Sequence, residues 1–406
     1  MIAVPLRRNR DFMLLQVGQL LSNAGSSSTS IAYPLLVLAV THSPAKAGIV
    51  GFARTLAWAL LTLPAGLAAD RWSRRRLMIA ADVVRMLALG SLAAAILLDR
   101  VAFWEIVVVA FVEGSGSALF RGSQPGALRA VAPPHQIPAA VAAETGRGAV
   151  VGLAGPPLGG ALFGVARGLP FLVDAVSYAF STLSLLAMRT PFQEEREPHL
   201  TSMSSRLAEA FRFVWSRPFL RTCALLFGLA NFIGPGVLLA VVVIGKQQGL
   251  SGGEVGVLVA AFGAFLLLGS LLSPFVRRLL PIRAVLLLEL WTWFGCAVFL
   301  VWPSVYVLTA GILPTALAIP STDSVVHGYR IAMTPDRLLG RAESVTTLIA
   351  LLIAPLGPLT AGVLLSTVSA RATIAVFAAA GVVLAVWGTW SPSIRTAPSL
   401  DDLSRA

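Results

Sequence analysis

Long apolar stretches separated by short polar connections repeat along nearly the whole chain. Each stretch reaches the roughly 20 residues that an α-helix needs to cross a bilayer. A transmembrane barrel would show short alternating strands, whereas these stretches are continuously apolar. Helices satisfy their own backbone groups in lipid, so helices are the form expected here. We expect them near residues 12–40, 47–69, 77–98, 102–122, 137–165, 169–188, 219–245, 254–276, 282–302, 304–327, 340–366 and 370–390.

Composition supports a membrane protein. The chain has 406 residues, of which 56% are hydrophobic and 12% charged, whereas a soluble domain carries roughly 25% charged residues. The lipid bilayer is therefore an expected partner. The net charge of +12 would suggest nucleic acid in a soluble protein. Here the basic residues lie between apolar stretches, so we expect lipid headgroup contacts and no nucleic-acid binding.

Basic residues are distributed unequally between the two sets of connections. If the N-terminus is inside, the inner segments hold most arginines, and the outer segments hold only five basic residues. Those five are Lys46, Arg100, Arg167, Lys246 and Arg371. The positive-inside rule then predicts a multi-pass protein of the cell membrane with both termini cytoplasmic. The first apolar stretch is too long for a signal peptide, so no cleavable signal is expected.

The two halves of the chain are related by a constant offset of 202 residues. Pro133, Gly155, Pro156, Gly160, Arg75, Arg76 and Leu77 recur as Pro335, Gly357, Pro358, Gly362, Arg277, Arg278 and Leu279. Matches in two separate loops indicate duplication. We therefore predict an all-α membrane protein with twelve transmembrane helices in two pseudo-symmetric six-helix bundles. The predicted domains are 1–188 and 219–406, with a cytoplasmic linker at 189–218 between them.

The linker contains an amphipathic segment. Its apolar and charged residues occupy opposite faces of a helix, the apolar set being Leu207, Phe211, Val214 and Trp215 and the charged set Arg206, Glu209 and Arg212. Such a helix is expected to lie on the inner membrane surface.

The loop between the second and third apolar stretches carries a recognisable motif. It contains Gly66, Asp70, Arg71, Arg74 and Arg75, followed by Asp82 and Arg85. This pattern resembles the signature of the major facilitator superfamily, and the continuation and the opening Asn9-Arg10-Asp11-Phe12 resemble its enterobactin and macrolide exporters. Ser73 stands where the family has a second glycine, which puts the turn geometry there in doubt.

The resemblance implies a cytoplasmic gate. In this interpretation Asp70 pairs with helix ends and arginines in one conformation only, and its partner lies near Gly340 and Arg341. The alternative is that the arginines only set the topology. The second half has no aspartate at the matching position, Leu272, and this asymmetry favours the gate.

The fifth apolar stretch contains Gly155, Pro156, Gly159 and Gly160. Small residues allow close helix approach and proline bends a helix. The element resembles the Gly-Pro-x-x-Gly-Gly element of the family's antiporters, which implies export. The alternatives are ordinary close packing and an importer.

Charged residues inside apolar stretches cost roughly 2.5 to 3.5 kcal/mol each on insertion scales and are candidates for function. Glu113 is the most central, and we predict that it takes part in proton coupling, with Glu289, Arg54 and Asp174 as further candidates. A structural hydrogen bond is an equal alternative for Glu113. Many proton-linked members carry an arginine at the position of Ala110, and this chain does not.

Two of these charges at similar depth, Arg54 and Asp174, could pair with each other. Asp82 and Arg85 lie close to an inner helix end, where we expect water to reach them. Glu144 and Arg147 lie three residues apart in one helix, so we expect a local structural pair.

Polar and aromatic residues in the spans are candidates for substrate contact. A polar first helix with Asn23, Ser26 and Ser27 is expected to face the central cavity of this fold, and Trp291 and Trp293 are further candidates. Core packing or lipid contact is the more common role of such aromatics.

The expected function is secondary active export of a small, partly hydrophobic compound, such as a drug, siderophore or secondary metabolite, by a proton-coupled monomer. No catalytic or metal-ligand pattern and no phosphate-binding loop is found, so no enzyme activity, metal or other cofactor is expected. A non-transporting membrane sensor or receptor on the same scaffold and a membrane-embedded enzyme are the competing hypotheses.

Overall fold

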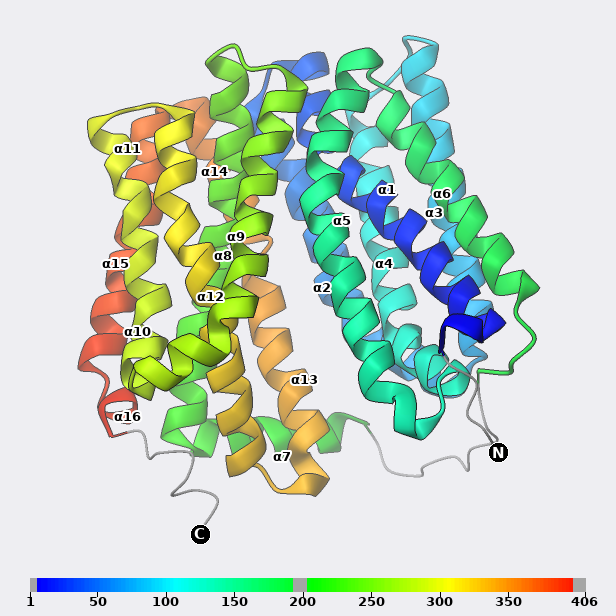
Figure 1. The fold of residues 1–406 in the computed structure, drawn as a ribbon. Helices are drawn as coiled ribbons and strands as arrows, with labels where there is room; N and C mark the ends of the chain where they lie inside the picture. Colours follow the sequence, from blue (N-terminus) through cyan, green and yellow to red (C-terminus); the bar gives the residue numbers. More distant parts are fainter. Residues whose placement is uncertain (1–5, 193–202, 397–406) are drawn as a thin grey trace. The chain divides into compact units, whose positions relative to one another are not determined.

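A computed structural model describes residues 6–192 and 203–396 (Figure 1). The helices of its first part are η1 (Leu6–Arg8), α1 (Arg10–Thr41), α2 (Pro44–Arg71), α3 (Arg74–Leu97), α4 (Phe103–Val131), η2 (Pro134–Gln136), α5 (Ile137–Val165) and α6 (Leu169–Ala187). Then follow α7 (Met203–Ser216), α8 (Pro218–Gln247), α9 (Gly252–Leu279), α10 (Ile282–Thr292), η3 (Trp293–Ala297), α11 (Val298–Val301), α12 (Val305–Met333), α13 (Asp336–Ile353), α14 (Leu356–Thr367), α15 (Ala370–Trp390) and α16 (Pro392–Arg395).

Twelve segments of the described chain are long and apolar enough to span a membrane. They coincide with the twelve predicted stretches, which confirms the fold class. Two helices run past the predicted ends at 122 and 327, because α4 ends at Val131 and α12 at Met333. The hydropathy pattern stops at the first polar residues, but a helix continues until its backbone is interrupted. Pro133 and Pro335 provide that interruption, since the residue before proline disfavours helical geometry.

The duplication is visible in the helices themselves. The bounds of α4, shifted by 202 residues, are those of α12. The bounds of α6, shifted in the same way, fall within one residue of those of α15. The offset found in the loops therefore extends to whole helices of the two halves.

The chain divides into two compact units, residues 1–197 with 245–260 and residues 198–244 with 261–406. In the first unit α1 packs against α5 and α6, α2 against α4, and α3 against α4 and α6. The end of α8 and the start of α9 belong to this unit, where Gly256 lies against the Pro156 carbonyl of α5. The predicted domain limits at 188 and 218 stay predictions.

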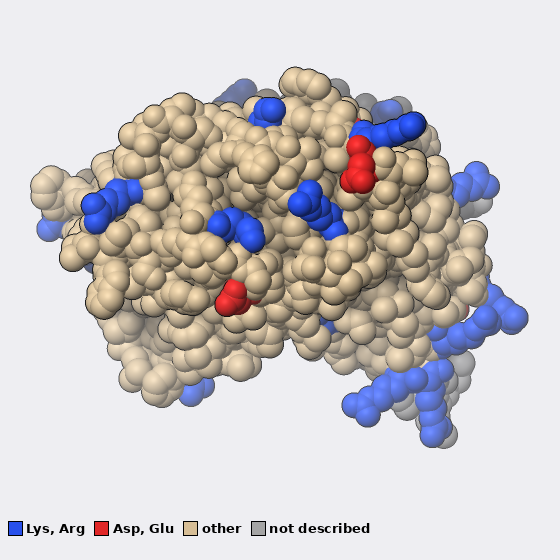
Figure 2. Space-filling view, turned by 90° about the horizontal axis from the view of Figure 1, so that it is seen from above, with Lys and Arg blue, Asp and Glu red and all other residues tan. Residues whose placement is uncertain are grey.

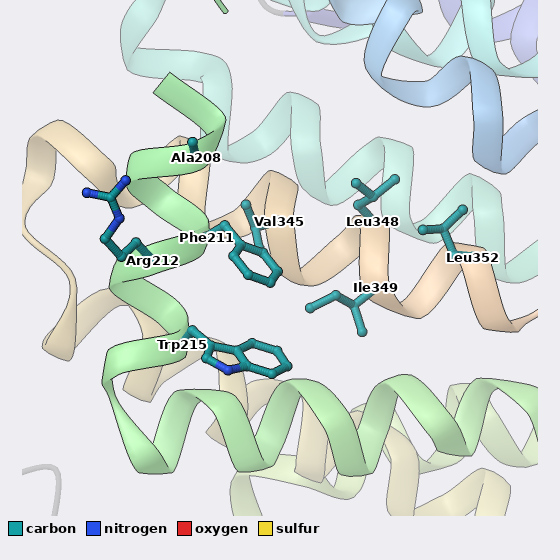
Figure 3. Close-up of a pocket in the computed structure, with 8 residues that line it drawn as sticks. All are labelled: Ala208, Phe211, Arg212, Trp215, Val345, Leu348, Ile349 and Leu352. Atoms are coloured by element: carbon teal, nitrogen blue, oxygen red, sulfur yellow. The ribbon is translucent and has the colours of Figure 1, made fainter. Parts of the chain in front are cut away.

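In the second unit α10 packs against α12 and α15, and η3 packs against the same two helices. The amphipathic segment forms the helix α7, which packs against α13 (Figure 3). Ala210 and Val214 of α7 are buried, whereas Phe211 and Trp215 are 46% and 40% exposed. The side chains of Arg206 and Leu207 lie outside the described part of the structure.

Charged side chains are sparse on the face seen from above. Figure 2 shows isolated basic and acidic groups there among uncharged side chains. The low share of charged residues in the chain is thus visible on this face as well.

Candidate functional site

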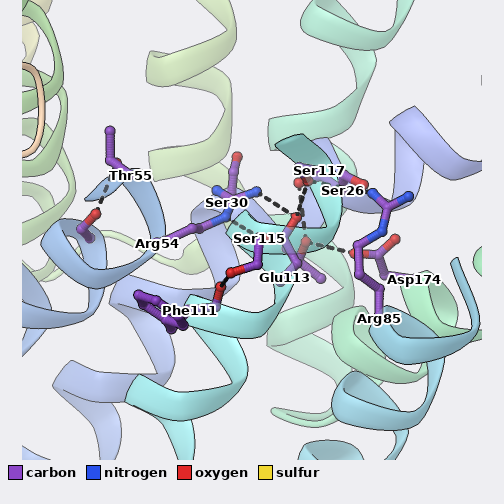
Figure 4. A network of polar contacts seen from close by, with 12 residues as sticks. Ser26, Ser30, Arg54, Thr55, Arg85, Phe111, Glu113, Ser115, Ser117 and Asp174 are labelled. Carbon is purple, nitrogen blue, oxygen red and sulfur yellow. Dashed lines mark hydrogen bonds and ion pairs between the residues drawn. The ribbon is translucent and has the colours of Figure 1, made fainter. Parts of the chain in front are cut away.

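An ion pair with a completely buried carboxylate joins two spans of the first unit. Glu113 of α4 is completely buried, and its carboxylate accepts hydrogen bonds from Nε and Nη2 of Arg54 on α2 (Figure 4). The Arg54 side chain is 28% exposed, so one end of the pair can be reached from outside the protein interior. The Tyr33 ring lies 5.7 Å from the Arg54 guanidinium carbon.

Gly114 makes this pairing possible. A Cβ atom at Gly114 would overlap the Arg54 carbonyl oxygen and lie 3.2 Å from the Ala57 Cβ. Without a side chain there, the backbones of α2 and α4 approach closely enough for Arg54 to reach Glu113. Two neighbouring residues of α4 therefore act together: Gly114 allows α2 to approach, and Glu113 forms the ion pair.

A chain of hydrogen bonds leads from Glu113 to the first helix. Ser117 donates to Glu113 Oε1 at 3.2 Å and accepts from Arg85 Nη1 at 3.4 Å. The same Arg85 nitrogen donates to the Tyr178 hydroxyl at 3.3 Å, and that hydroxyl is 2.8 Å from Ser26 Oγ. Four helices, α4, α3, α6 and α1, thus share one polar network inside the first unit.

Tyr178 and Ser117 are parts of this network that the sequence did not single out. Tyr178 is fully buried, and the Arg85 guanidinium carbon lies 4.2 Å from its ring centroid. One signal was present, because a tyrosine in the middle of an apolar span needs a partner for its hydroxyl.

Asp174 has different partners from those expected. It is completely buried and accepts hydrogen bonds from Thr29 at 2.8 Å and Ser177 at 3.1 Å. The predicted pairing of Arg54 with Asp174 is wrong, because Arg54 bonds Glu113 instead. Both carboxylates lie in the same unit, but the hydroxyls of α1 and α6 occupy the Asp174 oxygens.

Asp82 and Arg85 also differ from the prediction. Both were expected near a helix end within reach of water, but they are 0% and 4% exposed and form an ion pair with each other. Arg85 therefore belongs to the buried network and not to the loop. The second local pair was predicted correctly, since Arg147 Nη2 lies 3.7 Å from Glu144 Oε1.

The arginines of the α2–α3 loop bind helix ends. Arg75 donates to the carbonyls of Leu185 and Leu186 at 2.9 and 2.8 Å, at the end of α6. Arg74 donates to the Ala69 carbonyl at 3.3 Å, and its guanidinium occupies the space beside Gly126 of α4. Arg71 is exposed.

Ser73 resolves the doubt about the turn. Its φ of −58° is ordinary, and its hydroxyl accepts the Arg76 N–H at 3.5 Å as the N-cap of α3. A glycine is therefore not required at this position. The surroundings of Asp70, Gly340 and Arg341 lie outside the described part of the structure. A Cβ atom at Gly66 would meet no other atom within 4 Å.

The glycines of α5 lie where α1 approaches. A Cβ atom at Gly155 would overlap the Ser27 hydroxyl, and one at Gly159 would overlap the Ser28 carbonyl. Gly160 contacts the Gly252 backbone in the same way. The helix continues through Pro156 without interruption, from Ile137 to Val165.

The candidates for substrate contact in α1 are partly accessible. Asn23, Ser26 and Ser27 are intermediate in exposure, and Ser26 is bonded to Tyr178. In the second unit Trp291 is 44% exposed and bonded to Thr389, whereas Trp293 is buried in the core. Substrate contact by any of these residues stays a prediction.

Among the described residues of the second unit, one acid is buried. Glu289 of α10 is 7% exposed, and its Oε2 has no hydrogen-bond partner among the described residues. In the same described part, no group of three or more His, Cys, Asp or Glu residues is placed to hold a metal ion.

The sequence matches the family model of the Major Facilitator Superfamily over residues 15–288. It is 26% identical over 403 residues to the Multidrug efflux pump Tap of Mycolicibacterium fortuitum, covering 94% of this chain and 96% of that relative.

Solved structures share the fold. The nucleoside transporter NupG aligns with a TM-score of 0.74 at 13% identity, over 96% of this chain and 100% of that one. A bacterial homologue of the iron transporter ferroportin in an inward-facing state aligns with a TM-score of 0.72 at 18% identity, with the same coverage. With twelve apolar spans, a duplicated helix pattern and a family match over most of its length, the chain belongs to the Major Facilitator Superfamily of secondary transporters.

Proposed function

We propose that this transporter exports a small, partly hydrophobic compound, such as a drug, siderophore or secondary metabolite, in exchange for protons. The observation that carries the proposal is the ion pair between Glu113, completely buried, and Arg54, partly exposed, inside the membrane-spanning part of the first unit. The name of the relative, Multidrug efflux pump Tap, supports export and the substrate class. The glycines of α5 support export as well.

The pair has the chemistry that proton coupling needs. A proton on Glu113 removes the negative charge that balances Arg54, and an unbalanced charge in an apolar interior is costly. The partly exposed guanidinium then favours a conformation in which it reaches water or an acceptor group of the substrate. Loss of the proton restores the pair, so the two protonation states favour different conformations.

The hydrogen-bond chain offers a route from the proton to the substrate. Protonation of Glu113 weakens the hydrogen bond that its carboxylate accepts from Ser117. Ser117 is connected through Arg85 and Tyr178 to Ser26. Ser26 lies in the polar part of α1 where we propose that the substrate binds, together with Asn23 and Ser27. Proton and substrate sites are then energetically linked.

The proposal also covers the orientation in the membrane, the cytoplasmic gate and the oligomeric state. Both termini are cytoplasmic, the loop with Asp70 and Arg71 closes the cytoplasmic side in the outward-facing state, and the working unit is a monomer. Asp174 and Glu289 are secondary candidates for carrying a proton, because each is a buried carboxyl that forms no ion pair with an arginine or lysine among the described residues.

Everted membrane vesicles test the proposal. A pH gradient is imposed across the membranes of vesicles from cells with and without the protein. Uptake of ethidium, a fluorescent hydrophobic cation, is then followed with and without a proton ionophore. We expect gradient-driven uptake only with the protein. Uptake that ignores the gradient would exclude proton coupling.

Glu113→Gln tests whether Glu113 carries the coupled proton. We expect this variant to lose gradient-driven uptake while Glu105→Gln, in the first turn of the same helix, retains it. The double variant Arg54→Gln/Glu113→Gln removes both charges and should fold as well as the parent without coupling. Intact transport by Glu113→Gln would leave the pair a purely structural role.

A further inference from the structure

The second unit contains an apolar groove whose lining includes none of the residues that we propose for proton coupling or substrate contact. It lies between α7 and α13, has a volume of about 570 Å³ and is open at the surface. Phe211 and Trp215 of α7 form one wall and Val345, Ile349 and Leu352 of α13 form the other (Figure 3). The volume is in the range of ligand-binding pockets.

Chain connectivity places this groove at the edge of the membrane. The helix α7 ends at Ser216, and the span of α8 begins two residues later at Pro218. The opposite wall belongs to the first turns of another span, which begins at Ala342. Both walls therefore lie where a span meets the interfacial layer, with α7 amphipathic and too short to cross the bilayer.

The two sides of α7 differ in chemistry. Phe211 and Trp215 are stacked with ring centroids 5.1 Å apart, and both project toward α13. Arg212 lies on the groove edge, is exposed, and extends from α7 away from the apolar side chains (Figure 3). Among the described residues it forms no ion pair. Arg217 follows α7 directly, and Arg221 lies in the first turn of α8, so further basic residues are close to the end of α7.

We infer that this groove binds one anionic glycerophospholipid, with an acyl chain between α7 and α13 and the headgroup phosphate on Arg212. The apolar lining matches a hydrocarbon chain, and the bilayer supplies such chains at this depth. Arg212 supplies the charge complementary to an anionic headgroup, which arginine binds with two parallel hydrogen bonds. The aromatic residues are typical of the membrane interface.

The bound lipid would fix the position of α7. At the end of α7, Arg221 donates to the Trp215 carbonyl at 3.3 Å. An acyl chain that fills the groove completes the packing of its exposed aromatic face against α13.

Photo-crosslinking tests this site. The purified full-length protein is placed in phosphatidylcholine liposomes that contain a trace of phosphatidylglycerol with a photoreactive acyl chain, and crosslinked peptides are identified by mass spectrometry. We expect crosslinks on peptides of α7 and α13. A phosphatidylcholine probe with the same acyl chain should label these peptides less.

Variants separate the headgroup contact from the groove. Arg212→Gln should lower phosphatidylglycerol labelling about fivefold, the effect of one basic residue near an anionic surface, and leave phosphatidylcholine labelling unchanged. Arg371→Gln, a basic residue elsewhere in the same unit, is the matched control and should change neither. Ile349→Trp should fill the groove and lower labelling by both probes. If this variant does not elute as a folded protein in size-exclusion chromatography, Leu352→Trp is used instead.

Two results would overturn the inference. Labelling of α7 and α13 that is equal for both probes and unchanged by Arg212→Gln would show that no anionic lipid is selected. Loss of labelling when excess ethidium is added would assign the groove to a transported compound.

Discussion

At the scale of single residues, Gly114 and Glu113 act together although they belong to one helix. Glu113 supplies the buried charge, and Gly114 supplies the space that lets α2 bring Arg54 to it. The Arg54 carbonyl occupies the place of a side chain at position 114, so the contact tolerates no added atom. The geometry of the ion pair therefore depends on a residue that carries no charge.

Gly114→Ala should weaken both the packing and the ion pair. An added methyl group in a well-packed contact costs about 1 to 3 kcal/mol, so thermal unfolding of the detergent-purified protein should shift to lower temperature. Gly90→Ala in α3 is the control, because a Cβ there meets open space and alanine is the better helix former by up to about 1 kcal/mol. Equal melting temperatures for the two variants would contradict the packing argument.

Asp11 ties the start of α1 to the segment after α6. One of its oxygens accepts three hydrogen bonds, from the Arg189 N–H at 3.0 Å, the Thr190 N–H at 2.8 Å and the Thr190 hydroxyl at 2.6 Å. Asp11→Ala should therefore destabilise the protein by about 2 to 3 kcal/mol, as expected for bonds to a charged group. Thr190→Val removes only one bond and should cost less than half of that. The two effects are compared by thermal unfolding, and equal losses would refute the assignment.

The sequence identified the charged residues of the site but not their partners. Depth along each span is readable from the sequence, and it placed Arg54 and Asp174 at similar levels. Which helices are neighbours is not readable from one sequence, and α2 packs on α4, so Arg54 meets Glu113. For the same reason Asp82 and Arg85 were expected near water, although α4 and α6 cover them.

At the scale of elements, residues between α2 and α3 stabilise helix ends, which is a role that the family motif does not imply. Ser73 begins α3 with its hydroxyl, and Arg75 covers the free carbonyls at the end of α6. A basic group at a helix C-terminus satisfies these carbonyls and interacts favourably with the helix dipole. The loop thus connects α3 to α6 in addition to any role in gating.

Arg75→Gln should loosen the end of α6. The variant loses the charge and at least one of two hydrogen bonds, which we expect to cost about 1 kcal/mol. The adjacent Arg76 is exposed, and its side chain has no hydrogen bond in the described part of the structure, so Arg76→Gln is the control. Hydrogen exchange of the peptide containing Leu185 and Leu186 should increase in the first variant only. Faster exchange in both would point to a general effect of charge in the loop.

At the scale of the whole molecule, the duplicated helices of the two halves differ in the buried polar residues that they carry. The helices of the two halves correspond at an offset of 202 residues, but the polar network does not repeat. At this offset Arg54, Glu113 and Asp174 correspond to Gly256, Thr315 and Val376. Duplication therefore made the twelve spans and the fold predictable from the sequence, whereas the location of the network depends on residues that the first half carries and the second half does not repeat.

The arrangement of the chain across the membrane gives the last prediction. Cys223 and Cys296 are buried, and replacing them by serine and alanine gives a background without reactive thiols. Single cysteines are then introduced for Arg167 or Arg371, in short loops with few basic residues, and for Arg76 or Arg278, in the arginine-rich connections. Because arginine-rich segments stay in the cytoplasm, a membrane-impermeant maleimide should label the first two in intact cells and the second two only after permeabilisation. Labelling of all four positions in intact cells would mean that the cells are leaky. A cytosolic protein with a reactive cysteine is therefore the control, and it must stay unlabelled in intact cells. With that control in place, the opposite labelling pattern would place both termini outside the cell and reverse the direction of transport that we propose.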